Sequence, residues 1–238
     1  MIAEGKTLPD AGYDLETSQV YDERFSTPQG RMFDAVEWEE LTRAIEMVPP
    51  GASALEVGCG TGRFSKRLAE RGFHVRAIDP SRHMIELAMG KCRGIGNITF
   101  AREEGGAISS GDCAFDFTFA IRVLNNTGTV KYALKTMEEM IRVTKPGGLI
   151  LVEFMNGRRP FRRKSKYVLL SFSEISEAAR KQGCHVASRR GIMVLSQPFL
   201  DITPAPLLPL WRALERSAEV FLWRWASRGY ILLRKQTS

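Results

Sequence analysis

The sequence has 238 residues, of which 44% are hydrophobic, and a formal net charge of +7. This length suits one domain with a sizeable core, and the lack of any apolar run of about 18 residues excludes a membrane-spanning helix. The four cysteines and three histidines form no CxxC pair and no zinc-binding pattern. We therefore expect no metal site and the reduced thiols of a cytoplasmic protein.

The middle of the chain alternates predicted strands with predicted helices. Short apolar runs that end at glycine or Asp-Pro indicate strands, and apolar residues at helical spacing indicate helices. Strands are expected at 53–57, 74–78, 97–101, 115–123 and 149–154, helices at 63–70, at 84–88 after a Ser81 cap and at 131–143, and a turn at 146–148. Such alternation implies parallel pairing with right-handed crossovers, and hence a doubly wound, mostly parallel α/β sheet flanked by helices, a Rossmann-like fold.

The two ends of the chain depart from this alternation. Residues 1–48 contain helical stretches and are expected to form an N-terminal helical cap. Residues 49–238 would hold the main domain, with a substrate-binding or lid elaboration around 157–227, and the whole chain would form one structural domain. Within the tail we expect helices at 173–182 and 210–225, strands within 185–195 and at 229–235, and irregular chain at 198–209, where prolines are frequent.

A glycine loop follows the first predicted strand. Gly58, Gly60 and Gly62 permit a tight turn and a close approach of a ligand to the backbone at a helix N-terminus. Dinucleotide sites have a similar loop, against which pyrophosphate lies. Glu56 would repel that phosphate and instead suits a cationic group, while Asp79, at the end of the second strand, can accept hydrogen bonds from ribose hydroxyls. The two acids favour a cationic nucleoside over NAD, the cofactor of the competing oxidoreductase hypothesis.

Four motifs, in order and spacing, resemble those of class I S-adenosylmethionine-dependent methyltransferases, and within them the small-molecule, methyltransferase type 11-like family. The resemblance covers roughly residues 20–155. The motifs are Leu55-Glu56-Val57-Gly58-Cys59-Gly60-Thr61-Gly62, Ala77-Ile78-Asp79-Pro80-Ser81 followed by Met84-Ile85 and Ala88, Phe115-Asp116, and Arg142-Val143-Thr144-Lys145-Pro146-Gly147-Gly148. The resemblance implies S-adenosyl-L-methionine as cofactor and a methyl-transfer activity.

The resemblance also implies a role for individual residues. Gly58 and Gly60 would contact the methionine part of the cofactor, Glu56 its ammonium group, and Asp79 the ribose. Glu103 stands where the family often has an aspartate that accepts from the adenine amino group, although the usual Asp-Ala pair is Glu-Glu here. The full set of expected cofactor contacts is Tyr21, Glu56, Gly58, Cys59, Gly60, Gly62, Asp79, Pro80, Met84, Glu103, Glu104 and Ile121.

Methyl transfer is an in-line displacement, in which an enzyme mainly aligns the nucleophile and excludes water. A general base is hard to find in this sequence. Many relatives have histidines where Asn125 and Asn126 stand, and asparagine can orient a substrate but cannot take its proton. Arg122 could bind an acidic group. These three residues are the weak catalytic candidates, and each could equally be a solvated or capping loop residue.

The acceptor is open on sequence alone. Six basic residues within 158–166 would bind an acidic substrate, a phosphate backbone or an anionic membrane, or would only be a charged loop. The apolar stretch 198–225 would pack over the sheet, close an apolar site or lie beside a membrane. The lead hypothesis is a small-molecule acceptor, acidic or apolar. A lipid-like or quinone acceptor at a membrane surface is the alternative, a non-catalytic cofactor-binding module is the alternative of another class, and nucleic acid is disfavoured.

Overall fold

The computed structural model describes residues 21–159, 167–195 and 197–237, and these ranges form one seven-stranded sheet in the order β3-β2-β1-β4-β5-β7-β6. The pairs from β3 to β5 are parallel, and β7 pairs antiparallel with both β5 and β6. The strands are β1 (Ser53–Val57), β2 (His74–Asp79), β3 (Ile98–Arg102), β4 (Phe115–Ala120), β5 (Thr144–Met155), β6 (Cys184–Ile192) and β7 (Arg228–Lys235). The expected doubly wound, mostly parallel sheet is therefore confirmed.

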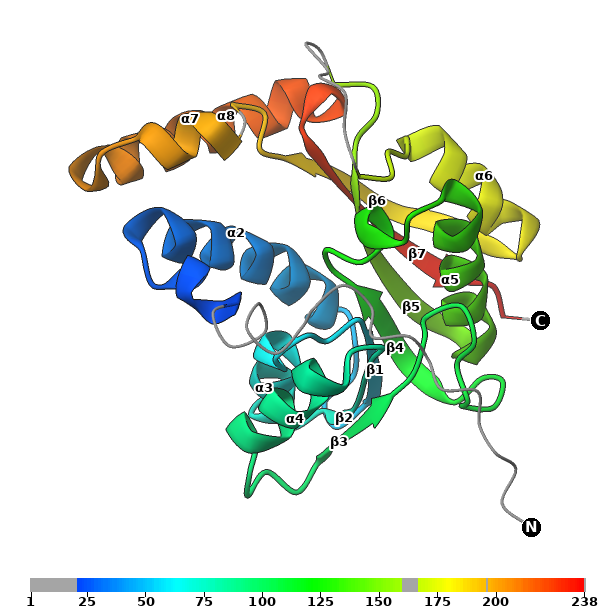
Figure 1. Ribbon diagram of the computed structural model, residues 1–238. Helices are drawn as coiled ribbons and strands as arrows, with labels where there is room; N and C mark the ends of the chain where they lie inside the picture. The colour runs from blue at the N-terminus through cyan, green and yellow to red at the C-terminus, as the bar shows by residue number, and fades with distance from the viewer. Residues whose placement is uncertain (1–20, 160–166, 196, 238) are drawn as a thin grey trace.

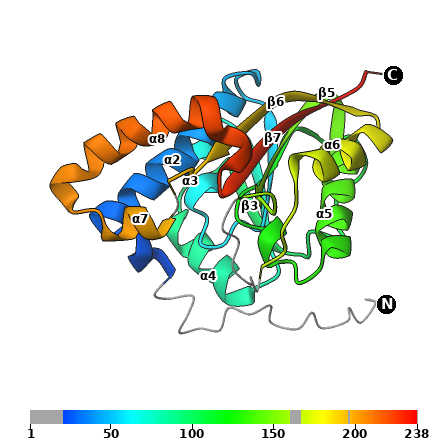
Figure 2. The same cartoon turned by 90° about the horizontal axis from the view of Figure 1, so that it is seen from above.

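Helices cover both faces of this sheet (Figures 1 and 2). Helices α2 (Pro28–Ile45), α3 (Arg63–Ala69), α4 (Arg82–Lys91), α7 (Gln197–Ile202) and α8 (Leu208–Leu222) lie on one side, and α5 (Val130–Val143) and α6 (Phe172–Lys181) lie on the other. The 3-10 turns are η1 (Tyr21–Phe25), η2 (Leu124–Asn126), η3 (Ala205–Leu207) and η4 (Trp223–Trp225). Within the described ranges, every helix is too short or too polar to cross a bilayer.

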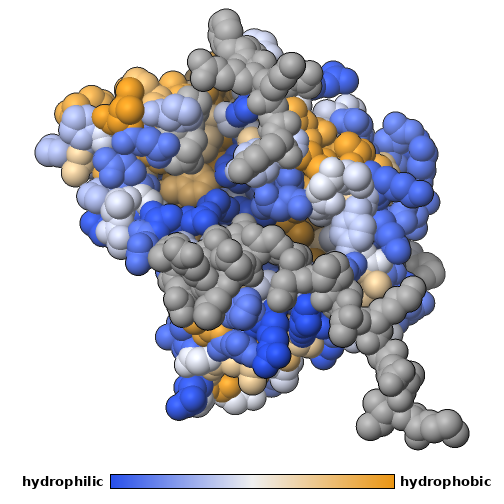
Figure 3. All heavy atoms as spheres, in the orientation of Figure 1, coloured by the Kyte–Doolittle hydropathy of each residue, from blue (hydrophilic) through white to orange (hydrophobic). Residues whose placement is uncertain are grey.

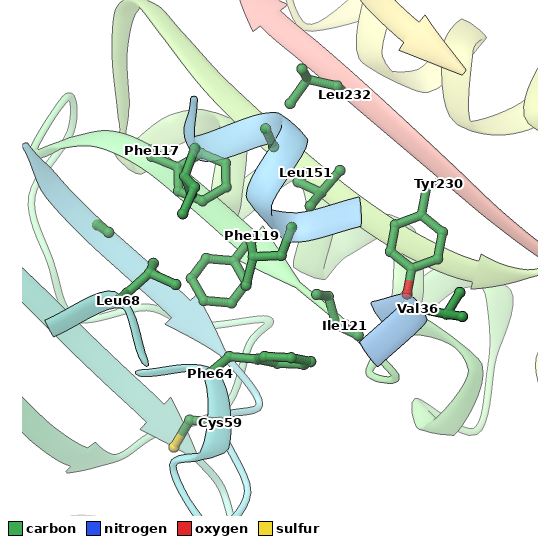
Figure 4. Packing of buried hydrophobic residues seen from close by; sticks show 14 of the residues in the cluster. Val36, Cys59, Phe64, Leu68, Phe117, Phe119, Ile121, Leu151, Tyr230 and Leu232 are labelled. Atoms are coloured by element: carbon green, nitrogen blue, oxygen red, sulfur yellow. The ribbon is translucent and has the colours of Figure 1, made fainter. Parts of the chain in front are cut away.

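The central strands are apolar on both faces, and each face has its own core. Successive residues of a strand point to opposite sides, so Leu149 and Leu151 pack toward α2 and α3 while Ile150 and Val152 pack toward α5 and α6. Figure 4 shows the first of these cores, in which Phe117 and Phe119 stack in the middle of β4. Burial on both faces is the reason that these strands read as continuous apolar runs in the sequence.

Serine and threonine caps begin helices α4, α5 and α6. The Ser81 hydroxyl accepts a hydrogen bond from the Met84 amide at the start of α4, as expected from the sequence. The Thr129 hydroxyl accepts a hydrogen bond from the Tyr132 amide at the start of α5. Ser171 forms a complete capping box with Glu174 at the start of α6. These local bonds fix where each helix begins, and thus where the loops at the carboxyl ends of the strands lie.

Three sequence predictions about element boundaries are wrong. The fourth strand ends at Ala120, three residues before Val123, because the chain turns at Arg122 with a left-handed φ of 65°. The turn at 146–148 lies inside β5, where the strand advances from Thr144 to Leu149 while its partner β4 advances only from Phe115 to Phe117. Residues 198–209 are mostly helical, since the prolines stand near helix starts, where proline is tolerated.

Candidate active site

The loop Gly58–Gly62 forms the tight turn that its glycines predict. All three glycines have left-handed φ values, of 71°, 53° and 77° in chain order. A Cβ on Gly58 would stand 2.4 Å from a methyl of Val123, whereas a Cβ on Gly60 would meet no atom within 4 Å. The amides of Gly58 and Cys59 both donate to the carbonyl of Ile78, at 2.8 and 2.9 Å, which ties the loop to the end of β2. The loop thus leaves an open backbone surface at Gly60.

Asp79 lies beside this surface, at the last position of β2. Its carboxylate accepts hydrogen bonds from the amides of Gly60, at 2.8 Å, and Ser81, at 2.9 Å. Burial raises the pKa of Asp79, and the two amide donors act in the opposite direction. Each carboxylate oxygen keeps a lone pair that a pair of ligand hydroxyls could fill.

Glu56 lies beneath the loop and does not line the cavity beside Asp79. Its side chain is buried between β1 and α3 and accepts a hydrogen bond from the Ser65 hydroxyl. Burial raises the pKa of Glu56 to about 8, although the Ser65 hydroxyl and Arg63 favour the charged form. The structure therefore brings Asp79, but not the Glu56 carboxyl, to the open face of the loop.

A cavity of about 330 Å³ opens above the glycine loop, at the carboxyl ends of the parallel strands. Of the residues expected from the sequence to contact a cofactor, eight line it: Tyr21, Gly58, Gly60, Asp79, Pro80, Met84, Glu104 and Ile121. Cys59, Gly62 and Glu103 do not. Cys59 is buried in the core, Gly62 packs against Ala88 of α4, and Glu103 is held away by Arg76 and Ser109.

Two polar residues of helix α5 reach the cavity one turn apart. The Tyr132 hydroxyl donates to the Glu104 carboxylate at 2.7 Å, and burial together with this bond raises the pKa of Tyr132 to about 12. Thr136 is fully buried, and its hydroxyl has no hydrogen-bond partner among the described residues. The sequence reasoning did not identify these residues, although their spacing of four on one helix face was a usable signal.

Arg122 and Asn126 line the other part of the cavity, and Asn125 does not. The Arg122 amide donates to the buried Glu153 carboxylate at 2.7 Å, and its guanidinium lies 3.9 Å from Glu37 of α2. The Asn126 side chain donates to the Arg122 carbonyl at 2.7 Å. Asn125 is buried, and its side-chain oxygen has no partner within the described ranges.

No cluster of three or more His, Cys, Asp or Glu side chains suited to a metal ion occurs in the part of the chain that is described. The seven residues 160–166, which hold most of the predicted basic loop, lie outside the described residues, as does the first part of the predicted cap, residues 1–20. Arg158 is exposed and Arg159 half-buried at the start of that loop.

Comparison with known proteins gives two kinds of similarity. A family model described as a methyltransferase domain matches residues 54–148. The demethylmenaquinone methyltransferase of Tropheryma whipplei is 34% identical over 137 residues, which cover 56% of each chain. The chain spans about half the length of the curated relatives that it matches first.

Solved structures share the fold at low sequence identity. The magnesium protoporphyrin IX methyltransferase from Synechocystis PCC 6803, solved with bound SAM, has a TM-score of 0.57 and 15% identity, covering 97% of this chain and 88% of that one. A (4+2)-cyclase, SpnF, has a TM-score of 0.64 and 19% identity, covering 83% and 80%. At this identity the structural similarity establishes the fold alone.

Proposed function

Residues 54–148 are a class I, S-adenosylmethionine-dependent methyltransferase domain, and from this premise we propose that the chain transfers a methyl group from S-adenosylmethionine to a small-molecule acceptor. The observation that carries the proposal is the single cavity that Asp79 and the open backbone of Gly60 line together with Arg122 and Asn126. Gly60 and Asp79 would hold a nucleoside, and the acceptor would then lie beside Arg122 and Asn126.

The residues present fit this cofactor. Gly60 offers backbone with nothing within 4 Å of a hypothetical Cβ, which suits a ligand lying flat on the loop. The unpartnered Thr136 hydroxyl is a buried polar group that needs a hydrogen-bonding partner, and an adenine edge would supply one. Asp79 would accept from the ribose hydroxyls, and Pro80 and Met84 would flank the base.

Glu56 would act on the cofactor ammonium from beneath the loop, through the backbone or a water molecule, because its carboxyl is buried. Tyr21 lines the cavity from η1 and would cover the bound cofactor. Glu104, held by Tyr132, would meet the base with its backbone N–H. Exclusion of water by these groups favours attack by the acceptor over hydrolysis.

When bound, S-adenosylmethionine supplies a methyl group on a sulfonium, which is already a strong leaving group. The protein's task is then to hold the acceptor in line with that methyl. Ile121 and Val123 would contact an apolar acceptor, and Arg122 and Asn126 would orient its polar atoms. Neither Arg122 nor Asn126 can take a proton near neutral pH, so the acceptor atom would be one that is already nucleophilic, or one that loses its proton to solvent.

A lipid-like or quinone acceptor is the finer form of the proposal. Its support is the similarity to a demethylmenaquinone methyltransferase and the apolar walls at Ile121 and Val123. Arg122 could then pair with an ionised ring oxygen of a reduced quinone, which would favour the ionised ring and hold it in line with the methyl group. An acidic metabolite that uses the same arginine is the competing small-molecule class.

The first test is calorimetric titration with S-adenosylhomocysteine and with NADH. We expect binding of the first and none of the second, and binding of NADH alone would overturn the proposal. The second test is a methyl-transfer screen against metabolite and lipid extracts, with mass-spectrometric detection of a gain of one CH₂ unit. Arg122→Met should lower transfer to an acidic or quinol acceptor and leave the affinity for S-adenosylhomocysteine within about twofold, since Arg122 lies at the acceptor end of the cavity.

A non-catalytic cofactor-binding module is the second candidate. The observation that favours it is that neither Arg122 nor Asn126, which line the cavity, can act as a base near neutral pH. Binding of S-adenosylhomocysteine with no methyl transfer to any extract would support this candidate against the first.

A further inference from the structure

Helix α8 turns its acidic side chains toward the protein. Glu215 is fully buried and accepts hydrogen bonds from the amides of Val194, at 2.7 Å, and Leu195, at 2.9 Å. Glu219 is also buried and accepts from Arg212 at 2.8 Å. The same Arg212 donates to Glu39 of α2 at 2.8 Å. The inward face of α8 is therefore held by these ion pairs and hydrogen bonds together with the buried side chains of Leu208 and Trp211.

The opposite face of α8 is apolar and exposed. We define the outer α8 face as Leu207, Leu210, Leu214, Val220, Phe221 and Trp225, whose exposed fractions run from 50% to 83%. Leu210, Leu214 and Phe221 fall within about 40° of one another on a regular helix. We call the part of the molecule that α7 and α8 form the α8 arm (Figure 1), and Figure 3 shows hydrophobic residues gathered at its surface. An ordinary surface helix has one apolar stripe, which it buries, whereas α8 buries Leu208 and Trp211 and also exposes a second apolar face.

The charges around the outer α8 face are mainly basic. Both acids of the helix are buried, whereas Arg224 is exposed, and the exposed Arg216 pairs with Glu39 of α2 at 3.2 Å. Arg158 is also exposed, and it lies near Arg224. Asn156 connects the two residues, because its side chain accepts from the Arg158 amide at 3.0 Å and donates to the Arg224 carbonyl at 2.9 Å. An acid, Asp201, is exposed on α7. A partner for this face must accept leucine, phenylalanine and tryptophan side chains and carry negative charge beside them.

From this face we infer that helix α8 and the turns flanking it dock the chain on an anionic phospholipid bilayer, with α8 lying in the plane of the interface. A bilayer provides hydrocarbon just below a layer of phosphate charge, which matches apolar side chains flanked by arginines. Trp225, at the end of the face, suits the headgroup level. A second copy of this chain fits less well, since two such faces would bring arginines together without exposed acids of α8 to pair with them.

The segment that carries the outer α8 face is joined to the helix next to the cavity rim. The Gln29 side chain of α2 donates to the Thr203 carbonyl at 2.8 Å, so the segment between α7 and α8 is joined to the helix that follows Tyr21. Tyr21 lines the cavity. The inference does not depend on the proposed methyl transfer, because it rests on the surface of α8 and on no residue of the cavity.

The test is flotation of the full chain with vesicles of phosphatidylcholine alone and of phosphatidylcholine mixed with phosphatidylglycerol. We expect the chain to float with the mixed vesicles and much less with phosphatidylcholine. L214S/F221S should bind mixed vesicles roughly tenfold less, because two exposed apolar anchors are lost. R224Q should bind them roughly fivefold less, which corresponds to one interfacial charge. High salt should weaken the wild type.

The matched control is M89S/V130S, which changes two exposed apolar residues of α4 and α5 away from this face and should float as the wild type does. Unchanged affinity for S-adenosylhomocysteine would show that each variant is folded. If L214S/F221S does not fold, R224Q still tests the inference independently. A wild type that stays in the soluble fraction would overturn the inference, as would a double variant that floats normally. A dimer that L214S/F221S converts to monomer, without vesicle binding, would assign the face to self-association instead.

Discussion

The glycine-loop end of the sheet and the α8 arm use charge in opposite ways. At the loop, Asp79 faces an open cavity and its partners are backbone amides. On α8, Glu215 and Glu219 are buried against the protein, and apolar side chains face outward. The comparison teaches that a polar residue marks a ligand site only when its surroundings leave it unsatisfied, and that a buried charge can be purely structural.

The largest expected effect tests the structural role of the charges on α8. Arg212→Met leaves Glu219 buried without its main partner and should lower the free energy of unfolding by about 3 kcal/mol. Urea denaturation measures it. Arg216→Met is the matched control, because Arg216 contacts the same Glu39 from an exposed position and should cost less than about 0.5 kcal/mol. Equal losses for the two variants would contradict the assignment of structural ion pairs to the inner face of α8.

The second prediction concerns Asp79 at the loop. Asp79→Ala removes the acceptor proposed for the ribose hydroxyls and should weaken S-adenosylhomocysteine binding by one to two orders of magnitude, or about 1.5–3 kcal/mol. Calorimetric titration measures the affinity. Asp79→Asn keeps the shape of the side chain and one acceptor oxygen. Its affinity for S-adenosylhomocysteine should fall between those of the wild type and Asp79→Ala. An unchanged affinity for Asp79→Ala would place the nucleoside elsewhere.

The third prediction concerns Glu56, a carboxyl of the loop region that is buried like those of α8. Its pKa is raised from 4.5 to about 8 in the folded chain, so between these values only the folded chain holds the proton. Stability from this group is complete below pH 4.5 and is lost as the pH rises through about 8. The unfolding free energy should fall by about 2 kcal/mol between about pH 6 and 7.5. Glu56→Gln, compared by urea denaturation at both values, should lack this decrease, and an identical slope would show that Glu56 is charged.

The smallest expected effect is at the helix cap beside the site. Ser81→Ala removes the hydroxyl that accepts from the Met84 amide and should cost about 1 kcal/mol of stability. Thermal denaturation measures the loss. Ser81→Thr keeps an acceptor hydroxyl and should retain most of the stability. Because Met84 lines the cavity, a drop in S-adenosylhomocysteine affinity that exceeds the loss of stability would show that the cap also positions the site.

Local rules predicted the elements and much of the cavity wall. Gly58, Gly60, Asp79 and Pro80 stand at strand ends, where parallel pairing brings them together whatever the rest of the chain does. Their position was therefore readable from the order of strands and helices. The same holds for the cap at Ser81, which depends on bonds within four residues.

Tertiary contacts decided what the sequence could not predict. Glu103 and Glu104 are neighbours with equal chemistry, and only the positions of Arg76 and Tyr132 in space decide that the second faces the cavity. The burial of Glu215 and Glu219 likewise depends on Arg212 and on the amides after β6. Helical spacing in the sequence showed that α8 is amphipathic, but which face points outward is set by these partners.

The position of β7 also sets the order in which the sheet can be completed during synthesis. Strand β6 pairs with β7 and not with β5, so it has no neighbour in the sheet until residues 228–235 have left the ribosome. Until then the edge of β5 offers unpaired backbone groups, the kind of edge that invites pairing between chains. Both α8 and β6 would wait for this strand, so the arm that carries the outer α8 face would be among the last parts of the nascent chain to reach its final place.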